Sequence, residues 1–216
     1  MTTEQSHAFD ARTIPAGRAL TRLDAEQPRA VVLALHGGKQ TSRQPVDGRS
    51  ASWKRMAALQ RSITPDLNRA GVSTWLLRYA VRGWNGGAPV IDARWALEQV
   101  RRELGDLPVV LLGHSMGGRT AAYVADHPAV VGVVALAPWW QSDDPGTALR
   151  GKAVVAAHGR SDKITSARMT RAFLQRADGV AAGTEFEDMG RVGHYMFRRV
   201  ADWNEFASSR CLSLLG

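Results

Sequence analysis

Continuous apolar runs alternate along the chain with segments in which apolar residues recur every three or four positions. A continuous apolar run is typical of a strand buried on both faces, whereas the recurring pattern predicts an amphipathic helix. The runs predict strands at 30–35, 108–112, 130–136 and 153–157. Less regular segments predict a short strand at 18–23, a strand at 72–78 and a weak strand at 184–187. The recurring pattern predicts helices at about 53–67, 93–104, 119–127, 167–177 and 196–207.

This alternation predicts how the elements are arranged in space. Strands that are joined by helices lie parallel, and strands buried on both faces need a helical layer on each side of the sheet. The expected fold class is α/β, as a single three-layer domain over residues 1–216 with a mostly parallel sheet and helices on both faces. Residues 1–28 are poorly defined by the pattern apart from the one short strand.

The composition is that of an ordinary globular domain. The 216 residues are 44% hydrophobic and 22% charged, and this length is enough to bury a core without disulfides. No apolar run approaches the length of a membrane span, and residues 1–20 lack the apolar centre of a signal peptide. We therefore expect a cytoplasmic protein with no membrane span. The single cysteine, Cys211, excludes an internal disulfide and argues against a cysteine metal site.

The formal charge is +8, and arginine supplies most of it. The only lysines are Lys39, Lys54, Lys152 and Lys163. The pairs Arg101-Arg102 and Arg198-Arg199 fall inside predicted helices, where they indicate a solvated face. Because no recognition motif accompanies the charge, we expect no nucleic-acid partner.

One short motif lies between a predicted strand and a predicted helix: Gly113-His114-Ser115-Met116-Gly117-Gly118. A serine on so tight a turn has strained backbone angles and close neighbours, so the residues two before and two after it must be small. Glycines occupy both positions. The Ser115 hydroxyl then projects from the end of the sheet, and the Met116 amide lies at a helix N-terminus, where it can point at a developing oxyanion.

Residues that can activate a serine follow the later strands. Asp162 follows the strand at 153–157, and His194 follows the weak strand at 184–187. A serine needs a base to take its proton, and the base needs a carboxylate to fix its tautomer. Ligands collect outside the carboxyl ends of parallel strands, where these loops meet. A fourth loop, His36-Gly37-Gly38, offers backbone amides that can face the Met116 amide across an oxyanion.

Together these segments resemble the α/β-hydrolases. The matching pieces span about residues 31–199 and appear in the order nucleophile, acid, histidine. The resemblance implies that Ser115 is the nucleophile, His194 the general base and Asp162 its orienting acid. It also implies an oxyanion hole made by the amides of Gly38 and Met116. The implied chemistry is hydrolysis of esters, thioesters, lactones or amides through an acyl-enzyme, with no metal or organic cofactor.

The chain departs from many α/β-hydrolases in one connection. Only residues 137–152 separate the two strands between which a helical lid is often inserted, so a large lid is excluded. The chain therefore resembles compact members such as small esterases and dienelactone-hydrolase-like proteins. The favoured function is a serine hydrolase acting on a small, soluble ester or lactone. An acyltransferase, a thioesterase or a peptidase with the same triad is the alternative, and a binding protein without turnover is a more remote one.

Other residues compete for these roles. Asp143 and Asp144 follow the preceding strand, where some α/β-hydrolases place their acid, and Asp188 lies near His194 in the chain. The histidines that compete with His194 are His36, His114, His127 and His158. His36, His114 and His158 occupy positions where the family often has a structural histidine. His127 ends a predicted helix, where it would have a capping role.

Aromatic residues follow two of the predicted strands. Trp139 and Trp140 are candidates for lining the substrate pocket, and simple packing is the equal alternative. Trp84 is a weaker candidate for the same role. Lys39 follows the predicted oxyanion amides, where it is either solvated or attracts an anionic substrate.

Overall fold

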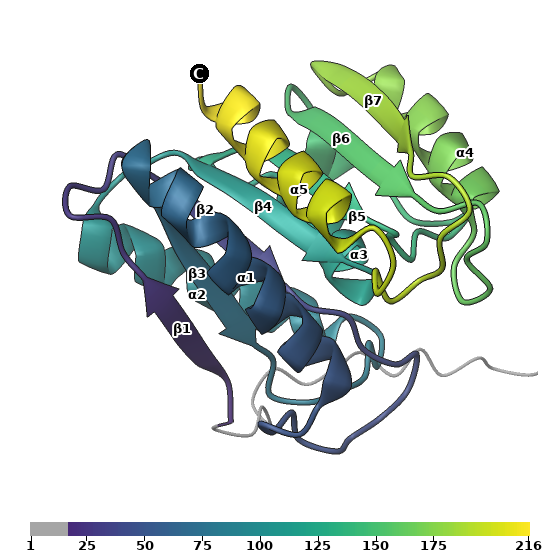
Figure 1. The fold of residues 1–216 in the computed structure, drawn as a ribbon, viewed down its shortest axis with the longest axis horizontal. Coiled ribbons are helices and arrows are strands. Elements are labelled where there is room, and N and C mark those ends of the chain that lie inside the picture. The colour runs from purple at the N-terminus through teal and green to yellow at the C-terminus, as the bar shows by residue number, and fades with distance from the viewer. Residues whose placement is uncertain (1–16) are drawn as a thin grey trace, which may run out of the picture.

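The computed structural model describes residues 17–216, in which seven strands form one sheet (Figure 1). The strands are β1 (Ala19–Leu23), β2 (Ala30–Leu35), β3 (Val72–Arg78), β4 (Val109–His114), β5 (Val130–Leu136), β6 (Ala153–His158) and β7 (Gly183–Asp188). The helices are α1 (Ala51–Arg69), α2 (Ala88–Leu104), α3 (Met116–Val124), α4 (Ala167–Asp178) and α5 (Val200–Leu215). A short 3-10 helix, η2 (Thr147–Leu149), lies between β5 and β6.

The strand order is β1-β3-β2-β4-β5-β6-β7. β1 pairs antiparallel with β3, and every other pair is parallel. From β2 the chain first adds β3 on one side and then returns to add β4 on the other. Ligands of such sheets bind at the point where the strand order reverses, outside the carboxyl ends of the strands. The loops after β2 and β4 therefore flank the expected binding crevice.

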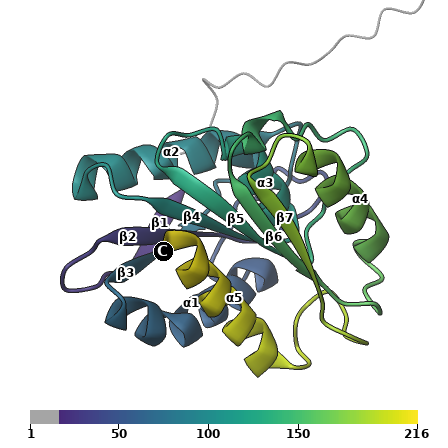
Figure 2. The same cartoon turned by 90° about the horizontal axis from the view of Figure 1, so that it is seen from above.

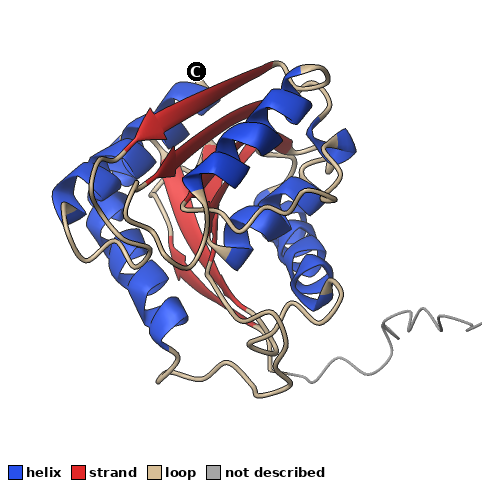
Figure 3. Cartoon of the chain, turned by 90° about the vertical axis from the view of Figure 1, so that its right-hand side faces the viewer, coloured by secondary structure: helices blue, strands red, loops and turns tan. Residues whose placement is uncertain are grey.

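Helices cover both faces of the sheet. α2, α3 and α4 lie on one face, and α1 and α5 lie on the other (Figure 2). Alternate residues of β2 serve the two layers, since Leu33 packs toward α2 while Val32 packs toward α1. Figure 3 shows the strands as the middle layer between helices. The predicted three-layer α/β fold is confirmed, and the short connection 137–152 contains no helical lid.

The last helix and α3 differ from the prediction. α5 begins at Val200 rather than Met196, because Met196 and Arg199 have left-handed φ angles of 55° and 56°, which a helix does not tolerate. The pair Arg198-Arg199 therefore precedes the helix instead of lying on its face. α3 begins at Met116, directly after the serine, and ends before the predicted boundary.

Two sequence expectations bear on the ends of the chain. The absence of a signal peptide was predicted from residues 1–20, of which 1–16 lie outside the described residues. Between residues 17 and 216, none of the helices combines the length and apolar character that crossing a bilayer requires. Cys211 is buried in α5, against the sheet.

Candidate active site

The Ser115 turn is built by close backbone contacts. Ser115 has φ 56° and ψ −118°, a strained combination for a residue with a side chain. A Cβ atom on Gly113 would lie 2.5 Å from the Gly117 carbonyl carbon, and one on Gly117 would lie 2.5 Å from the Leu35 carbonyl carbon. Only glycine fits at either position, so the packing of β2, β4 and α3 requires the glycines that the motif supplies.

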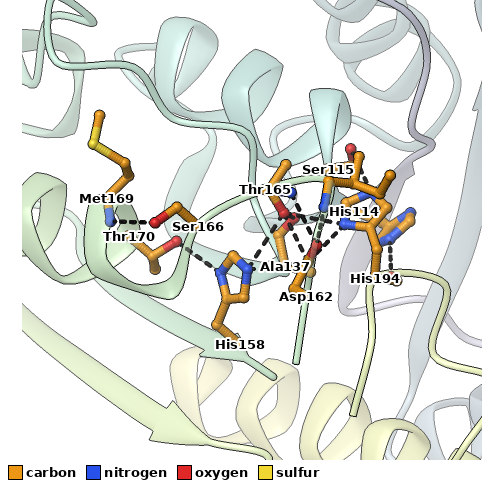
Figure 4. Close-up of polar contacts among 11 residues, drawn as sticks. His114, Ser115, Ala137, His158, Asp162, Thr165, Ser166, Met169, Thr170 and His194 are labelled. Atoms are coloured by element: carbon orange, nitrogen blue, oxygen red, sulfur yellow. Dashed lines mark hydrogen bonds and ion pairs between the residues drawn. The ribbon is translucent and has the colours of Figure 1, made fainter. Parts of the chain in front are cut away.

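His194 lies between the serine and an aspartate (Figure 4). Its Nε2 is 3.0 Å from Ser115 Oγ, and its Nδ1 is 2.8 Å from Asp162 Oδ2. All three side chains are largely buried, although they come from three different loops after β4, β6 and β7. When Nδ1 carries the imidazole proton and hydrogen-bonds to the carboxylate, Nε2 is unprotonated and can accept the serine hydroxyl proton.

The Asp162 carboxylate accepts four hydrogen bonds in addition to the one from His194. Oδ1 accepts the amides of Ile164 at 2.7 Å and Thr165 at 2.9 Å. Oδ2 accepts His158 Nε2 at 3.1 Å and the Thr165 hydroxyl at 2.8 Å. Burial acts to raise the pKa of this carboxyl, but the hydrogen bonds outweigh it and hold the pKa well below its usual range. Asp162 is therefore ionised wherever the protein is folded at ordinary pH.

The histidines at 36, 114 and 158 are buried and make structural hydrogen bonds. His158 also contacts the Thr170 hydroxyl at 2.8 Å, and His114 Nε2 donates to the His194 carbonyl at 3.0 Å. His36 donates from Nδ1 to the Gly37 carbonyl at 2.6 Å. Burial lowers the pKa of His114 to about 3 and that of His36 to about 4, so both are neutral at pH 7. None of the three is in hydrogen-bond reach of Ser115 Oγ among the described residues.

His127 lies three residues beyond the C-terminal end of α3. Its Nδ1 accepts the Ala129 amide at 3.3 Å, and its Nε2 lies 3.6 Å from a Glu98 oxygen. Within residues 17–216 the ring hydrogen-bonds to no carbonyl of α3, so the capping role stays a prediction, and no hydrogen bond joins His127 to Ser115.

The loop after β2 lies against the serine turn. A Cβ atom on Gly37 would be 3.2 Å from Ser115 Cβ, and one on Gly38 would be 2.6 Å from Met116 Sδ. Within residues 17–216, neither the Gly38 amide nor the Met116 amide donates to a protein acceptor. The two residues predicted to form the oxyanion hole are thus neighbours, and their amides are left available. Lys39 is exposed, and its backbone pairs with residues 82 and 84.

The competing aspartates lie in other interactions. Asp144 is buried and accepts two hydrogen bonds from Arg119, at 2.9 and 2.6 Å, and one from the Tyr123 hydroxyl at 2.8 Å. Asp188 pairs with Arg160 at 3.3 Å, and Asp143 is exposed. Within residues 17–216, none of their side chains hydrogen-bonds to His194, which leaves Asp162 as the carboxylate beside the base.

The tryptophans divide between packing and a cavity wall. Trp140 is buried, stacks on Phe173 at 4.3 Å and donates from Nε1 to the Gly118 carbonyl at 3.0 Å. Trp84 and Trp139 lie on the Arg119 guanidinium, with ring centres 4.3 and 4.6 Å away. Trp139 and Trp140 line a cavity of about 650 Å³ that reaches Asp162 and Thr165, whereas Trp84 does not line it.

Two features of the site were not predicted from the sequence. Thr165 contacts both Asp162 and His194, with its hydroxyl 3.0 Å from His194 Nδ1, and no motif marks a threonine three residues after the acid. Arg119 follows Ser115 by one helical turn, a spacing that places it on the same face of α3, but its partner Asp144 lies in a loop that has no such periodicity. No cluster of three or more possible metal-ligating side chains occurs in the described part of the chain.

Comparison with known proteins identifies one family model. The model of the alpha/beta hydrolase family matches residues 31–214. No curated protein sequence matches the chain significantly.

Many solved structures share the fold. An alpha-beta serine hydrolase homologue from Coxiella burnetii is 17% identical, with a TM-score of 0.70 over 89% of this chain and 91% of that one. Est1E from Butyrivibrio proteoclasticus with bound ferulic acid is 13% identical, with a TM-score of 0.66 over 92% and 95%. XC6422 from Xanthomonas campestris, an a/b serine hydrolase without a lid, is 17% identical, with a TM-score of 0.62 over 91% and 95%. At these identities the likeness establishes the fold alone.

Proposed function

Because the chain belongs to the alpha/beta hydrolase family, we propose that it is a serine hydrolase that cleaves a small, soluble carboxylic ester or lactone through an acyl-enzyme. One observation carries the proposal. His194 hydrogen-bonds to Ser115 Oγ through Nε2 and to Asp162 through Nδ1, at 3.0 and 2.8 Å. A hydroxyl, an imidazole and an ionised carboxylate in this order turn a weak nucleophile into an effective one.

In the acylation step, Ser115 Oγ attacks the carbonyl carbon and its proton passes to His194 Nε2. The ionised Asp162 stabilises the imidazolium without taking the proton. The negative charge that develops on the carbonyl oxygen is stabilised by the amides of Gly38 and Met116, which have no other acceptor in the described residues. When the tetrahedral intermediate collapses, Nε2 returns the proton to the leaving alkoxide, and the acyl group remains on the serine.

In the deacylation step, a water molecule takes the place of the alcohol. It gives a proton to His194 Nε2 and attacks the acyl carbon, and the same amides stabilise the second oxyanion. Collapse releases the carboxylic acid and returns the proton to Ser115 Oγ. With a lactone, the alcohol and acid remain parts of one molecule, so ring opening leaves a hydroxy acid.

The short connection between β5 and β6 supports a small, soluble substrate. Residues 137–152 fold as a loop and the η2 turn, and they supply no helical lid to cover a long acyl chain. The likeness to XC6422, a serine hydrolase without a lid, agrees with this.

Reaction with a fluorophosphonate tests the proposal without a guessed substrate. We expect intact mass spectrometry to show a single adduct on the wild type and none on Ser115→Ala or His194→Ala. Hydrolysis of short p-nitrophenyl esters should fall by several orders of magnitude in both variants. Circular dichroism checks that each variant is folded. Wild-type protein that is folded but takes no label, or Ser115→Ala protein that still hydrolyses esters, would contradict the proposal.

A further inference from the structure

Exposed cations gather at the edge of the sheet where Ser115 lies. The loops after β2, β6 and β7 and the first turns of α1 and α4 begin at this edge. Of the exposed cations on these segments, the following form no ion pair within residues 17–216: Lys39, Arg43, Lys54, Arg49, Lys163, Arg168, Arg191 and Arg198. On these loops Asp162 is buried, Asp47 pairs with Arg82, and Asp188, the last residue of β7, pairs with Arg160. The loop after β5 begins at the same edge and adds one exposed carboxylate, that of Asp143.

Elsewhere on the molecule, exposed arginines more often have acidic partners. The ion pairs away from this edge include Arg22 with Glu103, Arg69 with Asp66, Arg94 with Asp126, and Arg101 with Glu98. Exposed arginines without an ion pair in the described part of the chain also occur away from this edge, at Arg29, Arg61, Arg102, Arg150 and Arg176, but eight unpaired cations lie on the segments around the site. The field of such a group of cations raises the local concentration of anions.

The cavity beside Asp162 concentrates this charge further. Its lining includes Arg160, Lys163 and Arg168, and its one carboxylate is that of Asp162. That carboxylate is only 1% exposed and its oxygens already accept five hydrogen bonds. An anion that enters the cavity therefore meets cations and an aromatic wall, but no accessible negative charge.

Two residues connect the cavity to the reacting groups. The Trp139 amide donates to the Ser115 carbonyl at 3.0 Å, and the Thr165 hydroxyl lies 3.0 Å from His194 Nδ1. Both residues also line the cavity. The cavity therefore adjoins residues that contact the nucleophile and the base, although Ser115 and His194 are not among its lining residues.

We propose that the cavity formed by Trp139, Lys163 and Arg168 binds an anionic group of the substrate, so that the enzyme prefers esters bearing a carboxylate or a phosphate over neutral esters of the same size. The inference rests on the proposed function and narrows its substrate class. Lys163 and Arg168 supply charge-assisted hydrogen bonds to the anion, and the Trp139 ring packs against the carbon atoms that carry it.

Matched pairs of esters test this preference. The first pair is p-nitrophenyl hemisuccinate and p-nitrophenyl methyl succinate, which places the charge on the acyl side. The second is 4-carboxyphenyl acetate and its methyl ester, which places it on the alcohol side. In at least one pair, we expect wild-type kcat/KM to be about tenfold or more higher for the anion at low ionic strength. The ratio should fall toward one in 1 M NaCl, because salt screens the attraction.

Variants locate the preference in the cavity. The double variant Lys163→Gln, Arg168→Gln should lower the anionic-to-neutral ratio of kcat/KM by about tenfold. Arg61→Gln, Arg102→Gln removes the same charge from exposed helix positions away from the site and should leave the ratio unchanged. Equal loss in both double variants, or no preference in the wild type, would overturn the inference. Competitive inhibition by succinate or by inorganic phosphate distinguishes a carboxylate from a phosphate as the preferred anion.

Failure of this inference is distinguishable from failure of the proposed function. Wild-type protein that takes the fluorophosphonate and hydrolyses both esters of each pair equally retains the proposed function and loses only the anion preference. If no label and no hydrolysis are found, calorimetry with succinate and with phosphate still tests the cavity. Binding that is lost in Lys163→Gln, Arg168→Gln but kept in the control supports an anion site, and no binding overturns it.

Discussion

At the residue scale, Asp162 Oδ2 is the most heavily used acceptor of the candidate site. It accepts from His158, His194 and Thr165, while Oδ1 accepts two backbone amides. So many donors favour the ionised carboxylate and fix its orientation. The fixed carboxylate in turn holds the proton of His194 on Nδ1, and Nε2 is left as the basic nitrogen toward Ser115.

The Thr165 hydroxyl can be removed from this network while the branched shape of the side chain is kept. Thr165→Val keeps the branched shape but deletes both the donor to Asp162 and the oxygen beside His194 Nδ1. We expect the second-order rate of fluorophosphonate labelling to fall by about tenfold, the value of one charge-assisted hydrogen bond. Thr165→Ser restores the hydroxyl and should label at close to the wild-type rate. Equal rates in the valine variant and the wild type would show that the hydroxyl has no positioning role.

Gly38 offers a second test at the same scale. In Gly38→Ala, the new Cβ would lie 2.5 Å from the Arg82 carbonyl oxygen and 2.6 Å from Met116 Sδ, so the loop must move. Displacing one oxyanion amide should lower kcat for a p-nitrophenyl ester by about a hundredfold or more. Gly48→Ala is the matched control from the same loop, because no atom lies within 4 Å of its added Cβ. A Gly38→Ala enzyme with wild-type kcat would exclude Gly38 from the oxyanion hole.

At the scale of elements, one buried ion pair joins α3 to the loop after β5. Arg119 lies one turn after Ser115, and Asp144 holds its guanidinium against the rings of Trp84 and Trp139. The pair therefore fixes the loop that forms one wall of the cavity relative to the helix that carries the nucleophile. Removing one partner leaves a charge buried without compensation.

Asp144→Asn tests the structural role of this pair. The amide has nearly the shape of the carboxylate but no charge, so we expect the free energy of unfolding to fall by about 3–5 kcal/mol in urea denaturation. Asp143→Asn removes the same charge from the exposed neighbour and should change it by less than about 0.5 kcal/mol. If both variants lose the same stability, the effect belongs to net charge and not to the buried pair.

The elements also show what the sequence can predict. β5 begins and ends where its apolar run does, because a strand buried on both faces favours apolar residues throughout. β3 also has the predicted bounds, although it carries the buried polar residues Ser73 and Thr74. The serine turn was predicted because glycine spacing is a local requirement. The start of α5 was predicted wrongly. Met196 is buried and fits the helical spacing of apolar residues, but its backbone has a left-handed φ, so the helix begins only after it. The Thr165 contacts depend on three loops meeting, and no local pattern encodes such a meeting.

At the scale of the whole molecule, buried neutral histidines make stability depend on pH. His36 and His114 have pKa values lowered to about 4 and about 3, chiefly by burial, against an ordinary value of 6.5. The unfolded chain binds protons to these histidines between pH 6.5 and 4, while the folded chain does not. Their contribution to stability is complete above pH 6.5 and is lost as the pH falls toward their folded-state pKa values. Asp162 has a lowered pKa as well, but its contribution is lost only below its ordinary value of 3.8.

Acid sensitivity between pH 7 and 4.5 is therefore expected to come largely from these histidines. A shift of the pKa of His36 from 6.5 to about 4 corresponds to about 3 kcal/mol over the full range. His36→Gln removes this titration, although losing the ring also lowers stability at pH 7, because the Tyr79 amide and the Gly37 carbonyl lose their partners. Urea denaturation at pH 7.0 and 4.5 should thus show a smaller loss on acidification in the variant than in the wild type. Equal losses in the two proteins would place the acid-sensitive group elsewhere in the molecule.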